Sequence, residues 1–209
     1  MENKLSIIIP YYNTKKWCEN IIKKLLYQMI LYPQTEIILI DDCSTEDTSW
    51  LDKYKYLITI IHNEENMGVS FSRNAGLVRA TGNYIQFVDS DDDITDNFLS
   101  VIYENLDERF DYSLYRWYSN GKVTEGDIPE ESIKWNWAVW GYTFKRKVIG
   151  NIRFDETKNC MEDYDFISIV INKWQTRHIV DTPIYIYNSN NENSICHLIE
   201  EGKLDKIRK

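Results

Sequence analysis

The sequence predicts an α/β fold in which a mainly parallel central sheet is flanked by helices, with a small mixed region toward the C-terminus. Three observations lead to this prediction. Short apolar runs alternate with helical periodicity through residues 1–93, as parallel strand–helix units do. Three of those runs end in polar residues, at the edge where open parallel sheets bind ligands. After residue 93 the alternation becomes less regular.

The first half contains four predicted strands and two clear helices. The strands span residues 5–10, 36–40, 57–61 and 84–88, with a short helix between the second and third. The first long helix is indicated by two apolar series at intervals of four, Trp17, Ile21, Leu25, Met29 and Cys18, Ile22, Leu26, Ile30. We expect Asn13 or Thr14 to cap it and Pro33 to follow its end. A second helix over 69–80 ends before Gly82.

The second half predicts a sparser set of elements. Thr95 or Asp96 is expected to cap a helix. Asn120 and Gly121 form a strong signal for a hairpin turn. The expected elements are a helix to about residue 106, a strand over 112–118, a helix over 161–172 and two short strands over 178–180 and 185–187.

The composition fits one globular domain over residues 1–209. Hydrophobic residues make up 43% of the chain and the formal net charge is −9, which argues against a nucleic-acid partner. The four cysteines lack metal-binding or redox spacing and predict reduced thiols in a cytoplasmic protein. No apolar run approaches the ~20 residues of a membrane span. The basic segment 203–209 is interpreted as a solvated terminus, with peripheral contact to anionic lipid at the inner membrane face as the alternative.

The strand over 84–88 leads directly into Asp89, Asp91, Asp92 and Asp93. Like charges at a strand end repel one another, so a cation is expected among them. Mg²⁺ or Mn²⁺ held by one or two carboxylates keeps positions open for substrate phosphates. The segment therefore predicts a metal-dependent site for a diphosphate, in which Asp93 is only a solvated residue of the turn that caps the next helix.

Other interpretations of these segments are excluded by missing residues. An EF-hand beginning at Asp89 requires a glycine and a terminal glutamate where Ile94 and Ser100 stand. The first strand leads into residues 10–13, which contain no glycine, so a dinucleotide site or a Walker-type loop is excluded. The same absence argues against a sugar-phosphate nucleotidyltransferase.

Four segments together resemble the family 2 glycosyltransferases of the GT-A fold, namely residues 6–13, 38–45, 66–76 and 82–92. Their order and spacing match from residue 5 to about residue 93. Residues 139–146 and the pair Glu162-Asp163 are also similar to this family. The resemblance implies a single GT-A domain, with a nucleotide-sugar-binding half over 1–93 and an acceptor-binding and catalytic-base half over 94–209.

The resemblance implies donor-binding roles for residues of the first half. They are Pro10, Tyr12, Asp42, Arg73, Asn74, Asp89 and Ser90. Pro10, Tyr12 and Asp42 would contact the base of the sugar nucleotide. Arg73 and Asn74 would lie near its phosphates and sugar. Alternatively, Arg73 pairs with a surface carboxylate and Asn74 serves helix packing alone.

The resemblance also implies metal ligands and a catalytic base. Asp91 would ligate the metal directly, and Asp89 would contact ribose or metal-bound water. His197 is a third candidate ligand, with a structural role as the alternative. Asp163 would act as the base, since a carboxylate at a helix N-terminus keeps its charge. Glu162 would orient the acceptor or support the loop.

The resemblance implies metal-dependent, inverting transfer of one sugar from a nucleotide sugar. A UDP-sugar is expected, because it is the usual donor in this family. The acceptor would be a saccharide or lipid-linked molecule in surface polysaccharide biosynthesis, and the cofactor Mn²⁺ or Mg²⁺. The Q-x-x-R-W pattern of processive relatives is absent. Trp135, Trp137 and Trp140 are expected at the acceptor side or in the core. The alternative is a non-catalytic module that binds nucleotide or carbohydrate, against which the joint presence of the site aspartates argues.

Overall fold

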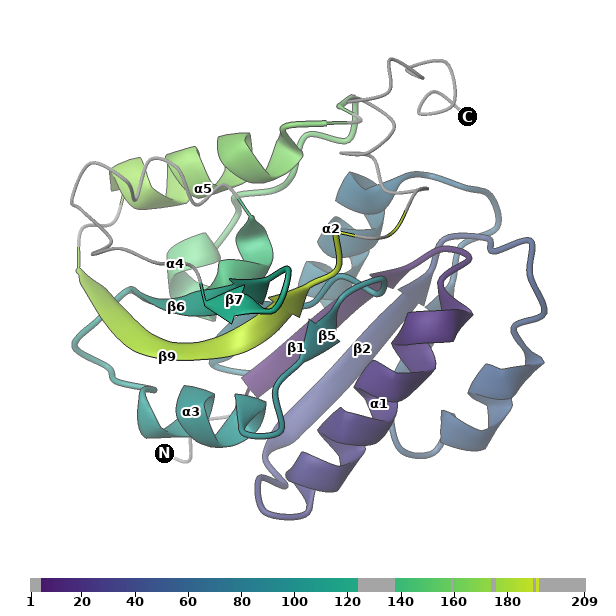
Figure 1. The fold of residues 1–209 in the computed structure, drawn as a ribbon. Helices are drawn as coiled ribbons and strands as arrows, with labels where there is room; N and C mark the ends of the chain where they lie inside the picture. Colours follow the sequence, from purple (N-terminus) through teal and green to yellow (C-terminus); the bar gives the residue numbers. More distant parts are fainter. Residues whose placement is uncertain (1–4, 124–137, 159, 174–175, 190, 192–209) are drawn as a thin grey trace.

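The computed structural model describes residues 5–123, 138–158, 160–173, 176–189 and 191 (Figure 1). Trp135, Trp137, His197 and the basic segment 203–209 lie outside the described residues, so the expectations for them stay predictions. No helix within the described part is long and apolar enough to cross a membrane.

Four parallel strands form the first half of the sheet, as predicted. They are β1 (Leu5–Tyr11), β2 (Thr35–Asp41), β3 (Thr59–His62) and β4 (Tyr84–Phe87), in the spatial order β3-β2-β1-β4. Leu5 of β1 lies opposite Thr35 of β2 and Tyr84 of β4. Because the four strands run in one direction, their carboxyl ends meet at one edge of the sheet.

Two helices lie on opposite faces of this parallel region, and a 3-10 helix joins β2 to β3. They are α1 (Lys15–Met29), α2 (Val69–Arg79) and η1 (Ser49–Tyr54). In β1, Ile7 belongs to the buried cluster on the α1 side and Ile8 to the cluster on the α2 side, because successive strand residues face opposite ways. Gly76 lets α2 approach β1 closely, since a Cβ atom there would lie 2.3 Å from Cγ2 of Ile8.

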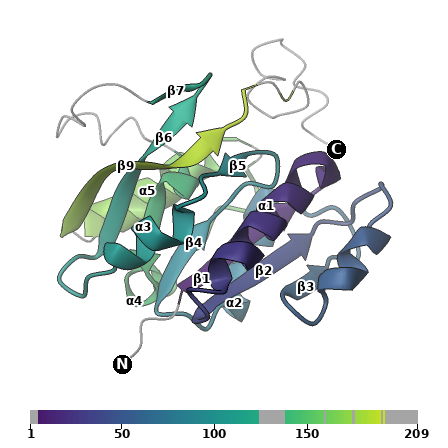
Figure 2. The same cartoon turned by 60° about the horizontal axis from the view of Figure 1, so that its bottom comes forward.

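The second half extends the same sheet and forms the expected mixed region. Its described elements are β5 (Asp93–Ile94), α3 (Phe98–Glu104), β6 (Tyr112–Ser119), β7 (Lys122–Val123), η3 (Val139–Gly141), β8 (Tyr142–Lys145), α4 (Arg146–Ile149), α5 (Glu162–Lys173) and β9 (Arg177–Tyr187). Strand β8 runs antiparallel to β4, and the order continues β8-β6-β9-β5. Strand β9 thus returns to the acidic segment after β4 (Figure 2).

The predicted hairpin is confirmed, whereas β9 and α3 differ from the prediction. Asn120 and Gly121 have φ values of 52° and 72°, as a type I′ turn between β6 and β7 requires. Strand β9 is continuous instead of two short strands, because register shifts along β6 accommodate Pro183, which cannot donate a ladder hydrogen bond. Helix α3 starts at Phe98 with Asn97 at its N-cap position, so neither Thr95 nor Asp96 caps it. The Thr95 hydroxyl instead donates to the Ile184 carbonyl of β9 at 3.2 Å.

Two further details are corrected by the structure. Strand β3 begins at Thr59, and Leu57, expected within it, is 59% exposed. Asp93 is not a solvated turn residue: it opens β5 and forms an ion pair with Lys24 at 2.8 Å. The acidic segment is therefore anchored to α1 at its far end.

Candidate active site

The ends of β1, β2 and β4 bring the predicted donor-site residues to one edge of the sheet. Tyr11 lies opposite Asp41, and the Asp42 amide donates to the Tyr11 carbonyl at 2.9 Å. Beyond β4, Ser90 is buried, and its Oγ accepts a 2.7 Å hydrogen bond from Oγ1 of Thr14. These bonds join the loops that follow three different strands.

Arg73 of α2 lies at the centre of three carboxylates, Asp89, Glu162 and Asp163, which are called the acidic cluster below. Its side chain is only 3% exposed, and Nη2 donates to Asp89 at 2.8 Å. Nη1 donates to Glu162 at 2.9 Å and to Asp163 at 2.5 Å. The ring of Phe154 lies 5.3 Å from its Cζ atom. Arg73 therefore pairs with the carboxylates of the predicted site and not with a surface carboxylate.

Asp163 lies in the first turn of α5, at the position predicted for the base. Its Oδ1 accepts the bond from Arg73, and its Oδ2 accepts a 2.9 Å bond from the Val139 amide. Burial raises the pKa of Asp163 to about 7, although the Arg73 charge acts to lower it. The charges of Glu162 and Asp89 raise it further, so the helix N-terminus does not keep Asp163 fully charged near neutral pH, contrary to the expectation from the sequence. A carboxyl group with a pKa near neutrality suits proton abstraction.

The loop after β4, which contains Asp89, Asp91 and Asp92 and is called the acidic loop below, is held by Tyr185 of β9 and by Asn191. The Tyr185 hydroxyl accepts from the Asp89 amide at 3.0 Å and donates to Asp92 at 2.8 Å. Nδ2 of Asn191 donates to Oδ2 of Asp91 at 2.8 Å. The sequence gives no motif for these partners, and only the predicted short strand over 185–187 hinted at an element nearby.

Within the described residues, Asp89 and Asp93 each pair with a cation, Arg73 and Lys24, whereas Asp91 and Asp92 form no ion pair. Burial raises the pKa of Asp91, and the charge of Asp89 raises it further. Burial likewise raises the pKa of Asp92 well above its usual range. Within the described residues, Arg73 is the cation that contacts the cluster.

A hard divalent cation fits this donor set, because Mg²⁺ and Mn²⁺ prefer carboxylate oxygens. In the part of the chain that the structure describes, no three or more His, Cys, Asp or Glu side chains group as ligands for a metal ion. Asp89 and Asp91 are the two loop carboxylates that would supply its protein oxygens.

Asp42 holds the chain between β3 and α2. Its Oδ1 accepts from Nδ2 of Asn63 at 2.8 Å and from the Met67 amide at 2.9 Å. Its Oδ2 accepts from the Gly68 amide at 2.7 Å, and Gly68 has a φ of 89°, which glycine adopts readily. Asp42 thereby shapes the entry into the helix that carries Arg73.

The remaining donor-site candidates lie at different distances from the acidic cluster. Asn74 binds the 154–156 loop: its Oδ1 accepts from the Phe154 amide at 2.9 Å, and its Nδ2 donates to Glu156 at 2.8 Å. These contacts correspond to the packing role given above as the alternative. Pro10 is buried within β1, and Tyr12, just beyond the strand, is 43% exposed.

Trp140 belongs to the core beside the acidic loop. Its ring stacks on Tyr185 with centroids 4.2 Å apart and planes 5° from parallel. Trp117 meets it edge-on at 5.4 Å. Trp140 is 6% exposed, so of the two positions expected for it the core is confirmed.

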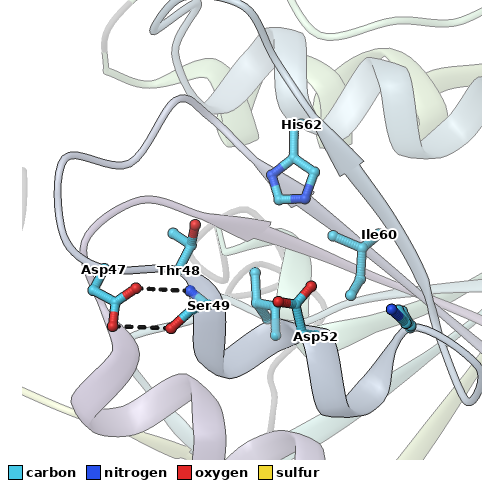
Figure 3. Close-up of a pocket in the computed structure, with 8 residues that line it drawn as sticks. Asp47, Thr48, Ser49, Asp52, Ile60 and His62 are labelled. Carbon is cyan, nitrogen blue, oxygen red and sulfur yellow. Dashed lines mark hydrogen bonds between the residues drawn. The ribbon is translucent and has the colours of Figure 1, made fainter.

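A hollow of about 620 Å³ lies between η1 and the edge strand β3, and none of the predicted site residues lines it (Figure 3). At one end Asp47 accepts bonds from the amide and hydroxyl of Ser49 at 2.9 and 3.0 Å, as the dashed lines show. This is a local turn at the start of η1. His62 lines the opposite wall and pairs with Asp41 at 2.9 Å. The Arg73 cluster remains the candidate active site.

Three features of this chain define the GT-A class of α/β proteins. They are the parallel β3-β2-β1-β4 region, the acidic loop after β4, and a mixed second half that adds an acidic pair at the start of α5. The family model described as glycosyl transferase family 2 matches residues 6–169. The chain therefore belongs to glycosyl transferase family 2.

Individual relatives agree with this assignment. The chain is 29% identical to the uncharacterized glycosyltransferase EpsJ of Bacillus subtilis (strain 168), over 97% of its own length and 65% of that protein. It is 26% identical to the minor teichoic acid biosynthesis protein GgaB of the same organism, over 90% of the chain and 23% of that protein. The crystal structure of S. aureus TarS 1-349 in complex with UDP matches with a TM-score of 0.79 and 25% identity, over 88% of this chain and 60% of that one. The chain thus spans less than two thirds of the length of each of these relatives.

Proposed function

We propose that this chain is the catalytic domain of a metal-dependent, inverting glycosyltransferase that moves one sugar from a UDP-sugar to a saccharide or lipid-linked acceptor. The observation that carries the proposal is the pairing of Asp163 with Arg73 beside Asp89. This pairing sets a carboxyl group of raised pKa next to the acidic loop, whose carboxylates Asp91 and Asp92 form no ion pair within the described residues. Family membership supports the reaction class. The UDP in the TarS complex supports the nucleotide, and the name of GgaB supports a cell-surface polymer as the product.

Asp163 is proposed to take the proton from the acceptor hydroxyl while that oxygen attacks the anomeric carbon. The new bond joins acceptor oxygen to sugar, the bond between sugar and phosphate breaks, and the nucleoside diphosphate leaves. One displacement of this kind inverts the anomeric centre, as in other oxocarbenium-like glycosyl chemistry. Arg73 and the Val139 amide orient the two oxygens of Asp163. Glu162 accepts a hydrogen bond from the same Nη1 atom of Arg73 that bonds to Asp163, and so helps to hold the guanidinium group beside the base.

Asp91 and Asp89 would hold the divalent cation, with His197 as a further proposed ligand. When bound, Mn²⁺ or Mg²⁺ offsets the charge of the leaving diphosphate. Oδ1 of Asp89 is bonded to Arg73, so its second oxygen is the one proposed to contact ribose or metal-bound water. Asp91 accepts a hydrogen bond from the neutral Asn191 side chain at 2.8 Å and is proposed as the direct ligand.

The donor nucleotide is proposed to lie over the ends of β1 and β2. Tyr12 is half-exposed and offers a ring face to the base, next to Pro10. Oδ2 of Asp42 holds one internal bond and can accept a second from the base. Ser90 and Asn74 would act through the loops that they fix. We propose that the protein works in the cytoplasm, at most in peripheral contact with the inner membrane face, where a lipid-linked acceptor would be presented.

The test is UDP release from a panel of UDP-sugars, measured with and without Mn²⁺ and with candidate acceptors. Turnover should require the metal, and Asp163→Asn should lower it by ~10²–10⁴ while UDP still binds. Asp165→Asn is the matched control, because Asp165 lies in the same helical turn but pairs with the exposed Lys158.

Three outcomes would count against the proposal. Wild-type turnover in Asp163→Asn would remove that residue from the mechanism. Binding of UDP with no turnover of any donor would favour the non-catalytic module. Failure to bind UDP, in calorimetry at millimolar nucleotide with Mn²⁺ present, would overturn the donor assignment altogether.

A further inference from the structure

Three residues at and beyond the end of β9, Tyr185, Asn188 and Asn191, contact the acidic loop at Asp89, Asp91 and Asp92. The Tyr185 hydroxyl links the Asp89 amide to the Asp92 carboxylate, at 3.0 and 2.8 Å. The Asn188 amide donates to Asp92 at 2.8 Å, and its side chain donates to the Asp91 carbonyl at 2.9 Å. These three residues lie beyond residue 169, where the match to the family model ends.

Asn191 makes the contact that bears most directly on a metal ligand. Its side-chain amide donates to Oδ2 of Asp91 at 2.8 Å, and the residue is 6% exposed. A donor on one carboxylate oxygen fixes the rotation of the carboxylate and leaves the other oxygen to point elsewhere. Partners of this kind, which orient a metal ligand, typically contribute 10–100-fold to metal affinity.

Tyr185 is equally constrained. Its side chain is fully buried, and its ring stacks on Trp140 with centroids 4.2 Å apart. The hydroxyl therefore cannot follow the loop if the loop moves, and it fixes the backbone at Asp89 and the side chain of Asp92.

The four donors that Tyr185, Asn188 and Asn191 supply to the loop carboxylates and the Asp91 carbonyl are neutral: a phenol, two side-chain amides and a backbone amide. They hold the loop carboxylates in place without neutralising them. A lysine or arginine in the same place would supply the missing charge and compete with a divalent cation. Neutral donors thus fit a loop that is ordered before the cation binds.

We propose that Asn191 and Tyr185 are positioning residues that hold Asp91 and Asp89 in the arrangement that binds the divalent cation. The proposal rests on the proposed function, in which these aspartates form the metal site. It adds a part of this chain outside the matched family segment as the second half of that site.

The experiment is calorimetric titration of Mn²⁺ into the full chain, with and without UDP. Asn191→Ala should weaken Mn²⁺ binding by 10–100-fold. Tyr185→Phe, which keeps the ring stack and removes only the hydroxyl, should weaken it in the same direction. Ser189→Ala is the control, because Ser189 is exposed and bonds to Asn120 instead of the acidic loop. Its affinity for Mn²⁺ should stay within twofold of the wild type.

A readout besides binding separates positioning from loss of fold. Thermal unfolding of the metal-free variants should change little for Asn191→Ala, whereas the rise in melting temperature on adding Mn²⁺ should shrink. Mn²⁺ affinities within twofold of the wild type in both Asn191→Ala and Tyr185→Phe would overturn this inference and leave the proposed function intact. Absence of Mn²⁺ binding by the wild type, with UDP present, would overturn the metal assignment on which both depend.

Discussion

Nη1 of Arg73 lies 2.5 Å from Oδ1 of Asp163, a contact that joins helices α2 and α5 across 90 positions of sequence. The candidate base is therefore held as one member of a buried ion pair. Its protonation reflects two opposed effects, since burial disfavours the carboxylate while the guanidinium favours it. Any change at Arg73 should be felt at Asp163.

The first prediction concerns pH. With a pKa of about 7 for Asp163, the ionised base should increase about tenfold between pH 6 and pH 8, and kcat/KM should rise with it. The ordinary pKa of 3.8 is lower, so ionisation is disfavoured in the folded state. The contribution of Asp163 to the free energy of unfolding should therefore be largest below pH 3.8 and decline as pH rises through 7.

A pH series of kcat/KM on the wild type and Asp163→Asn checks this prediction. The variant should lose the limb near pH 7, while Asp165→Asn should keep it. A wild-type profile that is flat between pH 6 and pH 8 would contradict a role for a titrating Asp163.

The second prediction concerns the stability of the Arg73 cluster. Arg73→Met leaves the carboxylates of Asp89, Glu162 and Asp163 without their cation, and it should lower the free energy of unfolding at pH 7 by about 3–5 kcal/mol. The loss should shrink at pH 5, because Asp163, whose pKa is raised to about 7, is then largely protonated and carries no unpaired charge. Urea denaturation at both pH values measures it.

Arg79→Met is the control for this change. Arg79 lies on the same helix but is exposed, so its substitution should alter stability by less than about 0.5 kcal/mol. Equal losses in Arg73→Met at pH 5 and pH 7 would mean that lost packing against Phe154, and not unpaired charge, dominates.

The location of the site follows from the sequence because strand ends are encoded locally. The apolar run over 84–88 stops at Asp89, and the run over 36–40 stops at Asp41 and Asp42. Parallel pairing then places such ends at one edge, whatever the details of packing. Asp163 is likewise marked by the helical pattern that starts beside it.

The contacts that hold the site cannot be foreseen in the same way, because they join distant positions. Asn191 and Asp91 lie 100 positions apart, and no local pattern assigns one to the other. Strand β9 is expected as two pieces, over 178–180 and 185–187, yet register shifts beside Pro183 keep it continuous. That continuity carries Tyr185 to the acidic loop.

The third prediction concerns the approach of α2 to β1. Gly76→Ala places a methyl group 2.3 Å from Cγ2 of Ile8, so the helix or the buried Ile8 side chain must shift, at a cost of about 1–3 kcal/mol. Urea denaturation measures the loss. Val78→Ala, at a position 76% exposed on the same helix, should stay within about 0.5 kcal/mol of the wild type. A neutral Gly76→Ala would contradict the prediction that this close approach leaves no room for a methyl group.

The fourth prediction concerns Asp42, which accepts three hydrogen bonds from the chain between β3 and α2. Asp42→Asn turns an NH₂ group toward backbone donors and should cost about 1–3 kcal/mol of stability. Hydrogen exchange at the Met67 and Gly68 amides should accelerate, and UDP should bind more weakly because the entry to α2 loosens. Asp52→Asn, at an exposed position of η1, should change neither quantity. Unaltered exchange in Asp42→Asn with weakened UDP binding would show that Asp42 acts on the nucleotide alone.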